Sequence, residues 1–293
     1  MRLNPTLSEW INLAARWAHI FAAILWVGTT YFFTWLDGRF TAHEKRAEAG
    51  ESDVWMVHSG GFYVVEKRKG LDRLPSDLHW FRWEAAFTWL TGALLLVVVY
   101  YLGGALVAPH VREETVACYN GLAGGRLKGV FNLSAHYDAF AIAASVVTLA
   151  LAWVVYDLLV RSPLGRNEKA FAAVGFLLTA GLAYALTHVF SERAAYLHVG
   201  AAYGTIMAAN VWMRILPAQR RMVAALKEGR HFDESLGARA KLRSKHNTFM
   251  VVPVVFTMIS NHFPSTYGSE YNWLILSALV LVGWAAAYVI RRA

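Results

Sequence analysis

The stretch RWAHIFAAILWVG, residues 16–28, determines the fold class of this chain. It belongs to an apolar block at residues 8–36, which is longer than the about 20 residues that a helix needs to cross a bilayer. Arg16 and His19 lie near the start of this stretch. Ionisable side chains are costly inside a membrane and usually have a function there. The stretch therefore predicts a transmembrane helix with a functional histidine.

Six further apolar blocks follow along the chain, and charged segments separate them. The seven predicted spans lie at residues 8–36, 84–107, 136–160, 170–190, 195–216, 247–263 and 272–290. Hydrophobic residues make up 57% of the 293 residues, and they gather in these blocks instead of spreading along the chain as in a soluble protein. The sequence predicts an all-α, polytopic transmembrane helix bundle in which residues 1–293 form a single membrane domain.

The lysines and arginines predict the orientation of the bundle. Of the 28, 21 lie on one side of the predicted membrane, 5 lie on the other, and Arg16 and Arg214 lie within spans. Lysine and arginine accumulate on the cytoplasmic side of membrane proteins, so we expect the N-terminus outside and the C-terminus inside. This topology also accounts for the net charge of +8, and we expect no binding to nucleic acid.

Sequence motifs exclude several classes of protein. The single cysteine, Cys118, rules out an internal disulfide, and the chain has no C-x-x-C-H motif for a covalently attached haem. It also lacks a Walker loop, a dinucleotide fingerprint, an H-E-x-x-H motif and a G-x-S-x-G motif. Hydrolases and nucleotide-driven pumps are therefore not expected, and any haem is held without a covalent bond.

Five histidines fall on the predicted outer half of the membrane: His19, His136, His188, His198 and His262. An imidazole there is either a haem ligand or an interfacial side chain that bonds to water or to a carbonyl group. Small residues follow His198 along its helix, which indicates either close helix packing or a porphyrin lying against the helix. We expect non-covalent haem b held by two of His19, His198 and His262, with His136 and His188 as reserve candidates.

Two arginines lie close to these histidines in the predicted topology. Arg16 is one helical turn from His19, and Arg193 lies in the short outer loop between the fourth and fifth spans. Either guanidinium group suits a haem propionate. The alternative for Arg16 is that its side chain extends to the outer headgroups.

A second group of histidines lies on the predicted inner side. His58, His79 and His246 form a candidate site for an additional metal or for substrate. The inner loop at residues 37–83 also contains several aromatic residues, which predict a short ordered segment at the level of the lipid headgroups. They are Trp55, Phe62, Tyr63, Trp80, Phe81 and Trp83.

Six stretches together resemble one known family in order along nearly the whole chain. They are RWAHIFAAILWVGTTYFFTWLD, VHSGGFY, LHWFRWEAAFTWLTG, HVGAAYGTIMAANVWM, SKHNTFMVVPVVF and MISNHFP. These stretches are similar to the N-terminal membrane domain of the membrane-bound, cytochrome-linked urate oxidases, also called urate hydroxylases. The resemblance implies an oxidoreductase of purine catabolism in the bacterial inner membrane, and it names urate as the substrate.

The same resemblance implies that urate is converted to 5-hydroxyisourate without peroxide and that electrons pass through haem to a cytochrome c. In that family a further span and a C-terminal cytochrome c domain follow the membrane domain, whereas this sequence ends at AYVIRRA without them. Either a separate, soluble cytochrome c is the electron acceptor, or the sequence is a truncated form of a longer chain. The sequence leaves the catalytic residues and the oligomeric state open.

Two other functions compete with this one. A membrane haem b protein that only carries electrons from a quinol to an outer acceptor would use the same histidines. An anion transporter would use them as proton relays, but the two halves of the chain lack the repeated, broken-helix pattern of many transporters. A haem spectrum separates the first two functions from transport.

Overall fold

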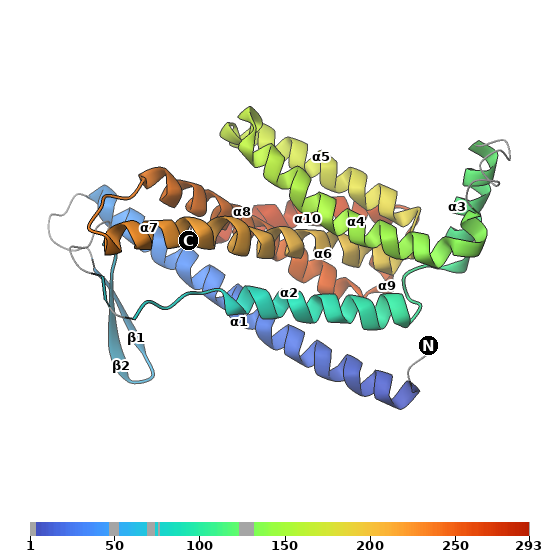
Figure 1. Ribbon diagram of the computed structural model, residues 1–293, viewed down its shortest axis with the longest axis horizontal. Coiled ribbons are helices and arrows are strands. Elements are labelled where there is room, and N and C mark those ends of the chain that lie inside the picture. The colour runs from blue at the N-terminus through green and yellow to red at the C-terminus, as the bar shows by residue number, and fades with distance from the viewer. Residues whose placement is uncertain (1–3, 47–52, 69–73, 76, 123–131, 293) are drawn as a thin grey trace.

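The computed structural model describes residues 4–46, 53–68, 74–75, 77–122 and 132–292, and most of these residues are helical. Most of the helices run side by side as an elongated bundle, while α3 stands apart at one end (Figure 1). The α-helices are α1 (Pro5–Arg46), α2 (Trp83–Leu95), α3 (Pro109–Leu122), α4 (Leu133–Arg161), α5 (Glu168–Thr187), α6 (Glu192–Asn210), α7 (Leu216–Lys227), α8 (Glu234–Ser260), the short α9 (Pro264–Tyr267) and α10 (Asn272–Ile290). Two π-helical segments continue α2 and α6, namely η1 (Leu96–Leu102) and η4 (Val211–Ile215), and a 3-10 turn, η3 (Pro163–Arg166), precedes α5.

Five helical segments in the described residues are long and apolar enough to cross a membrane. They are α1, α2 with η1, α4, α5 and α10, and they match five of the seven predicted spans. The other two predicted spans fall on α6 and α8, which are helical but less apolar. An all-α bundle with membrane-spanning helices agrees with the sequence, whereas seven crossings and their orientation stay predictions.

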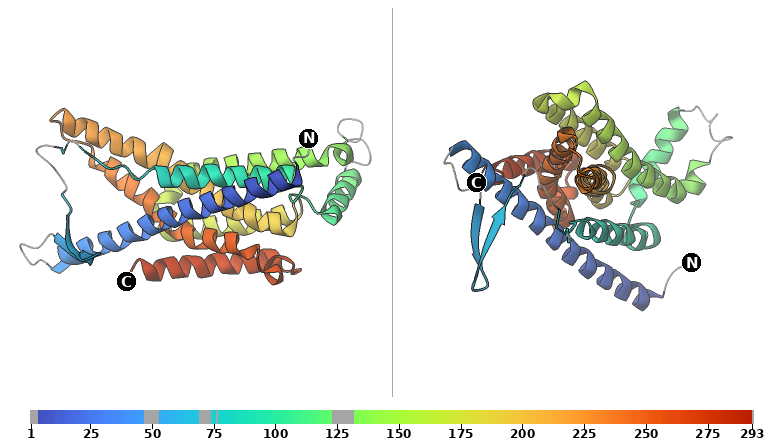
Figure 2. Two further views of the ribbon diagram at one scale, coloured as in Figure 1. Left: turned by 90° about the horizontal axis from the view of Figure 1, so that it is seen from below. Right: turned by 60° about the vertical axis from the view of Figure 1, so that its left-hand side comes forward.

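Helix α6 lies in the middle of the bundle, and this position explains its composition. Twelve of its 19 residues are buried, and Figure 2 shows the other helices arranged around it. A helix covered by other helices needs small side chains for close approach more than it needs large apolar ones. Its Gly200 packs against Thr257 of α8, where an added Cβ would lie 2.9 Å from the Cβ of Thr257. Close helix packing therefore accounts for Gly200, one of the small residues near His198.

Polar side chains fix the starts of four helices. At each of these positions a side-chain oxygen accepts a hydrogen bond from a backbone N–H in the first turn, which replaces a bond that the helix itself cannot supply. The capping residues are Asn132 for α4, Asn167 for α5, Ser191 for α6 and Asp233 for α8. These caps determine where the bundle helices begin, and therefore which residues of neighbouring helices lie at the same height along the bundle axis.

The predicted inner loop contains a β-hairpin formed by β1 (Asp53–His58) and β2 (Gly61–Glu66). Ser59 and Gly60 connect the strands with φ angles of 50° and 77°, the positive values that tight hairpin turns require. Val54 packs against Leu36 and Phe40 of α1. The prediction of an ordered segment in this loop is confirmed, while its place at the membrane surface stays a prediction.

Candidate substrate cavity and histidine sites

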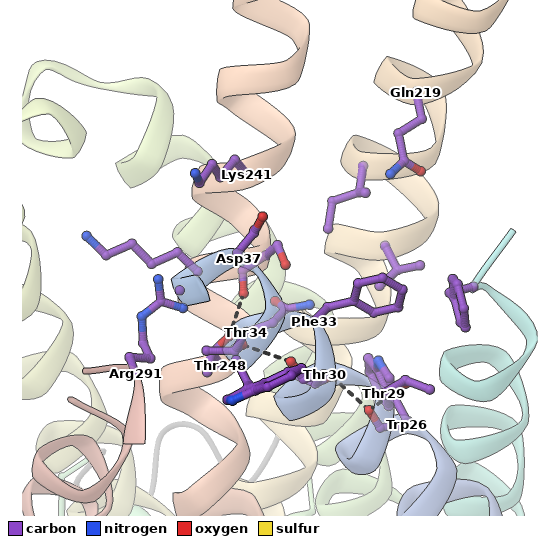
Figure 3. A pocket seen from close by; sticks show the side chains of 18 of the residues that line it. Trp26, Thr29, Thr30, Phe33, Thr34, Asp37, Gln219, Lys241, Thr248 and Arg291 are labelled. Carbon is purple, nitrogen blue, oxygen red and sulfur yellow. Dashed lines mark hydrogen bonds between the residues drawn. The ribbon is translucent and has the colours of Figure 1, made fainter. Parts of the chain in front are cut away.

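A cavity of about 950 Å³ lies at one end of the bundle. Its walls come from the C-terminal half of α1, the chain before α2, η4, α7, the first half of α8 and the end of α10 (Figure 3). The distribution of lysine and arginine predicts that this end lies on the inner side of the membrane. These walls are far apart in the sequence, so only the folded bundle creates the cavity.

The cavity walls carry more positive than negative side chains. The basic residues are Arg39, Lys241, Lys245, Arg291 and Arg292, and the acidic residues are Asp37 and Glu84. Two of these charges are already paired, since Lys245 lies 2.6 Å from Glu168 and Asp37 lies 2.5 Å from Lys67. Lys241 makes no ion pair with any residue that the structure describes. The excess of positive charge favours an anionic ligand.

Three threonines of α1 give the cavity a row of hydrogen-bond acceptors. The hydroxyl of Thr30 donates to the carbonyl oxygen of Trp26 at 2.8 Å, and the hydroxyl of Thr34 donates to the carbonyl oxygen of Thr30 at 2.8 Å. Thr29 donates to the carbonyl oxygen of Leu25 at 2.9 Å. A threonine hydroxyl has a single proton, so these bonds leave only lone pairs for a ligand. This row of threonines therefore suits N–H groups.

Five aromatic side chains form part of the apolar lining, together with aliphatic side chains. The aromatic residues are Trp26, Phe33, Trp35, Trp80 and Phe81. Phe33 meets Phe81 edge to face with ring centres 4.8 Å apart, which closes the wall between α1 and the chain before α2. His79 lies beside this wall, with its ring centre 4.5 Å from that of Phe81. Cations, acceptor oxygens and aromatic rings together suit a planar anion with N–H groups.

A second hollow of about 410 Å³ adjoins the cavity. The two share Leu78, His79, Trp80 and Val223 as lining residues. The second hollow extends beside α7 to Lys227, at the end of the bundle. The shared lining residues show that the second hollow is next to the cavity on the side of α7.

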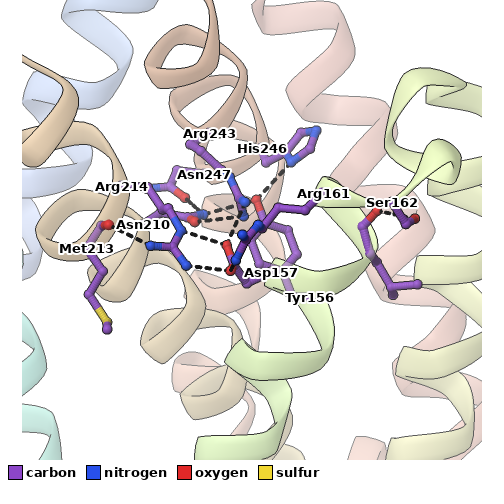
Figure 4. Close-up of polar contacts among 11 residues, drawn as sticks. Tyr156, Asp157, Arg161, Ser162, Asn210, Met213, Arg214, Arg243, His246 and Asn247 are labelled. Atoms are coloured by element: carbon purple, nitrogen blue, oxygen red, sulfur yellow. Dashed lines mark hydrogen bonds and ion pairs between the residues drawn. The ribbon is translucent and has the colours of Figure 1, made fainter. Parts of the chain in front are cut away.

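A buried ion cluster joins α4, η4 and α8 beside the cavity (Figure 4). Asp157 is 4% exposed and accepts hydrogen bonds from Arg243 at 2.6 Å and from Arg214 at 2.8 and 2.5 Å. Arg161 lies 3.6 Å from the same carboxylate. Three cations around one anion leave a net positive charge, and a buried carboxylate is tolerated only with such partners.

Two asparagines connect this cluster to the cavity. Asn210 donates to the hydroxyl of Tyr156 at 3.0 Å and to the side-chain oxygen of Asn247 at 2.9 Å. Asn247 in turn donates to the carbonyl oxygen of Met207 and lines the cavity. The π-helical turn η4 supports both sites, because it directs Arg214 to the cluster while Val211 lines the cavity. Such turns often occur at functional sites.

Among the outer histidines, His19 has the arrangement of a metal ligand. Its Nδ1 lies 3.0 Å from the carbonyl oxygen of Thr88 and 3.1 Å from the hydroxyl of Thr91. Its Nε2 makes no hydrogen bond with any described residue. Histidines that bind metals commonly donate one ring N–H to a carbonyl group and present the other nitrogen to the metal. His19 therefore fits haem ligation, and it packs on Gly92 of α2.

His198 has a different environment, because both of its ring nitrogens have protein partners. Nδ1 lies 2.6 Å from the carbonyl oxygen of Ala194, and Nε2 lies 2.7 Å from the hydroxyl of Ser145. The hydroxyl of Tyr101 is 2.6 Å from that of Ser145. An iron at Nε2 requires the Ser145 hydroxyl to move away. In this arrangement His198 is part of a buried hydrogen-bonded chain and does not present a nitrogen to a haem.

The other three outer histidines are exposed and lie at helix ends or kinks. His262 follows the end of α8, and His136 lies in the first turn of α4 at a kink with φ −118° and ψ 19°. His188 follows α5, and its Nδ1 lies 2.8 Å from the carbonyl oxygen of Tyr184. The structure does not gather the five predicted histidines around one point.

The two predicted propionate-binding arginines lie on different helices and have separate asparagine partners. Arg16 on α1 donates to the side chain of Asn12 at 2.6 Å, and Arg193 on α6 donates to the side chain of Asn261 at 2.8 Å. A guanidinium group can bind an anionic group such as a carboxylate, but a joint site for the two arginines stays a prediction.

The three inner histidines lie in separate places. His58 is exposed at the end of β1, and its Nδ1 lies 2.8 Å from the hydroxyl of Ser59. His246 is stacked on Phe171, with ring centres 4.9 Å apart. His79 lines the cavity. Within the described part of the chain, no three His, Cys, Asp or Glu side chains are grouped to hold a metal ion. The structure therefore does not bring these histidines together, and it supports only His79 as a substrate-site residue.

Sequence reasoning missed the residues that define the cavity and the ion cluster. The ion cluster could have been anticipated from Asp157 and Arg214. They are opposite charges in two predicted spans, and such charges usually pair with each other inside a membrane protein. The threonine row of α1 gave no such signal, since threonine is common in membrane helices and bonds to its own helix. Which helix faces meet in space cannot be read from periodicity alone.

Comparison with known proteins gives one clear match. The family model described as "Urate oxidase N-terminal" matches residues 5–292. No curated protein and no solved structure matches the chain.

Proposed function

Since the chain belongs to the urate oxidase N-terminal family, we propose that it is a membrane-bound oxidoreductase that oxidises urate in the cavity between α1, α8 and α10. The observation that carries this proposal is the composition of the cavity walls. Urate is a planar anion with N–H groups and carbonyl oxygens. The walls provide aromatic rings, hydroxyl acceptors and an excess of cations, so each kind of group on urate has a partner.

The reaction in this proposal removes two electrons from urate while water adds at C5. Urate and water give 5-hydroxyisourate, two protons and two electrons. Lys241 and Arg291 bind the negative charge, and Thr30 and Thr34 accept the N–H groups of the ring. His79 and Glu84 line the same cavity and accept the protons released as water adds.

The electrons leave toward the other end of the bundle in this proposal. His19 is the residue that would hold haem b, and a haem held there would supply one-electron transfer. His19 lies seven residues before Trp26 on α1, which is about 10 Å along the helix axis. Arg16 and Arg193 are the residues that would bind the haem propionates, and a soluble cytochrome c on the outer side is the final acceptor in this proposal.

Steady-state turnover under nitrogen tests the proposal. Purified protein is mixed with urate and oxidised cytochrome c, and the absorbance of each is followed. We expect loss of urate coupled to reduction of about two cytochromes per urate, because each cytochrome accepts one electron, and no hydrogen peroxide when air is admitted. Lys241→Gln should weaken urate binding, whereas Arg220→Gln, an exposed cation on α7 outside the cavity, should not.

The competing functions give different results in the same assay. Urate that stays unchanged while a quinol reduces a bound haem supports an electron carrier. Urate that crosses a vesicle membrane unchanged supports a transporter. Peroxide formation with loss of urate contradicts the cytochrome-linked reaction but keeps urate as the substrate.

A further inference from the structure

The β-hairpin has two faces with opposite surroundings. Direct cross-strand partners share a face of a sheet, and the register pairs Trp55 with Val64 and Val57 with Phe62. Val54, the neighbour of Trp55, points to the other face, where it is 5% exposed and packs against α1. The hairpin is therefore attached to α1 by one face only.

The other face is apolar and uncovered in the described structure. Trp55 and Val57 are each 70% exposed, Phe62 is 82% exposed and Val64 is 49% exposed. Residues 54–65 contain no Asp, Glu, Lys or Arg. Soluble surfaces seldom present a continuous apolar sheet face of this kind, and such a patch marks an interaction site. Because these residues include no Asp, Glu, Lys or Arg, this face can enter an apolar layer without the free-energy cost of desolvating such a charged side chain.

The hairpin lies at the level where the candidate spans end. Its root is joined to α1 by the ion pair between Lys67 and Asp37. One turn earlier on α1, Phe33 contacts Phe81, which lies two residues before α2 begins. Asp37 and Ile290, the last residue of α10, line the same cavity. The hairpin is thus at the end of α2 and α10, and it projects sideways from the bundle across its long axis (Figures 1 and 2).

We propose that this apolar face lies in the headgroup layer of the same membrane that the bundle crosses, on the side of the cavity. A sideways projection at the end of the spans lies along the membrane surface and not in open solvent. Aromatic side chains favour this interfacial layer, and Trp55 and Phe62 provide them. The hairpin thereby anchors the inner end of α1, which contributes the threonine row to the cavity. The anchoring itself is independent of the proposed function.

Site-directed fluorescence in liposomes tests this placement. The exposed Cys118 is first replaced by serine, and a bimane label is then attached to Val57→Cys or to Phe62→Cys. Both positions are exposed on the hairpin, so the label does not disturb the core. His231→Cys, in the exposed loop between α7 and α8, is the aqueous control, and Leu151→Cys, 52% exposed on α4, is the lipid control.

We expect the hairpin labels to show a blue-shifted emission, quenching by lipids with a nitroxide near the headgroup, and loss of quenching by iodide. The His231 label should keep full iodide quenching, and the Leu151 label should respond most to a nitroxide deep in the acyl chain. Iodide quenching of the hairpin labels equal to that of the His231 label overturns the proposal. Protection from both quenchers also overturns it, because a protein surface then covers the face.

Discussion

At the scale of single residues, the threonines of α1 bear on substrate specificity. Their hydroxyl protons are used within the helix, so Thr30 and Thr34 present only acceptor lone pairs to the cavity. Thr30→Val and Thr34→Val keep the shape of each side chain and remove the acceptor. A lost hydrogen bond of about 1 kcal/mol corresponds to about a fivefold weaker urate affinity for each variant, with little change in kcat.

Equilibrium binding and steady-state kinetics measure this effect. Thr187→Val is the matched control, because Thr187 also donates to a carbonyl of its own helix but lies outside the cavity. A urate methylated on a ring nitrogen lacks one N–H, so it should bind more weakly than urate to the native protein. One of the two threonines faces the methylated position. In the variant that replaces this threonine, the difference in affinity between urate and methylated urate should be smaller. Unchanged urate affinity in both variants contradicts the proposed contact.

His19 gives the residue-scale prediction for the cofactor. Its Nε2 makes no hydrogen bond with a described residue, while its Nδ1 lies within hydrogen-bond distance of the carbonyl oxygen of Thr88 and the hydroxyl of Thr91. His19→Ala should therefore remove or shift the Soret band of the purified protein, because an axial ligand is lost. His110→Ala, an exposed histidine that pairs with Glu192 on the surface, should keep the native spectrum. Native haem content in His19→Ala shows that His19 does not hold the haem.

At the scale of helices, the contact between α6 and α8 depends on the absence of a side chain at Gly200. A Cβ there would meet the side chain of Thr257. Gly200→Ala should lower the free energy of unfolding by about 1–3 kcal/mol, because the two helices must shift or separate. Gly204→Ala, one turn later on α6 with nothing within 4 Å of the added Cβ, should be neutral or stabilising by up to about 1 kcal/mol.

Thermal unfolding of the detergent-purified variants compares these two glycines. The pair shares a helix and a substitution, so intrinsic helix propensity contributes equally to both. Equal melting temperatures for the two variants would contradict close packing of α6 on α8 at Gly200.

The ion cluster gives the second prediction at this scale, because it joins α4, η4 and α8. Asp157→Asn removes the only carboxylate that contacts Arg214 and Arg243 in the described structure. Leaving buried Arg243 without an anion should cost about 3 kcal/mol or more. Arg161→Gln should change stability by less than about 1 kcal/mol, since that side chain is 66% exposed and 3.6 Å from the carboxylate. Chemical denaturation of both variants under one detergent condition measures the difference.

At the scale of the whole molecule, the cavity and His19 lie at different levels along α1. If the proposed function and the predicted orientation both hold, urate would enter from the cytoplasmic side and electrons would move toward the outer side. The substrate and the electron acceptor would then lie on opposite sides of the membrane. Oxidation of a cytoplasmic purine would in that case require no transport of urate.

Reporter fusions test this orientation. The charge distribution, with 21 basic residues on one side and 5 on the other, predicts a cytoplasmic location for the segments after Arg46 and after Lys227. A fusion after Leu122, which ends α3 on the other side of the bundle, should report the periplasm. A periplasmic signal from either of the first two fusions would reverse the side from which urate enters.

The sequence by itself predicted the long apolar helices that form the bundle and the family to which the chain belongs. Spans such as residues 136–160 and 272–290 correspond closely to α4 and α10. A helix that contacts lipid needs about 20 consecutive apolar residues, and such a run can be recognised in the sequence without knowing the helix's neighbours. The predicted span at residues 195–216 also coincides with a helix, α6 continued by η4. That this buried and less apolar helix crosses the membrane stays a prediction. The sequence also named His19 as a candidate haem ligand, which stays a prediction, and it gave no indication of the partner Thr88.

Only the tertiary structure decided which side chains form sites. The sequence pattern does not distinguish His19 from His198. In the structure, the hydroxyl of Ser145 is hydrogen-bonded to Nε2 of His198, whereas Nε2 of His19 has no described hydrogen-bond partner. Asp157 meets Arg243, 86 residues away, and Thr34 shares a cavity with Arg291. The physical reason is that helix formation depends on neighbours a few residues apart, whereas burial and pairing of polar groups depend on which helix faces meet.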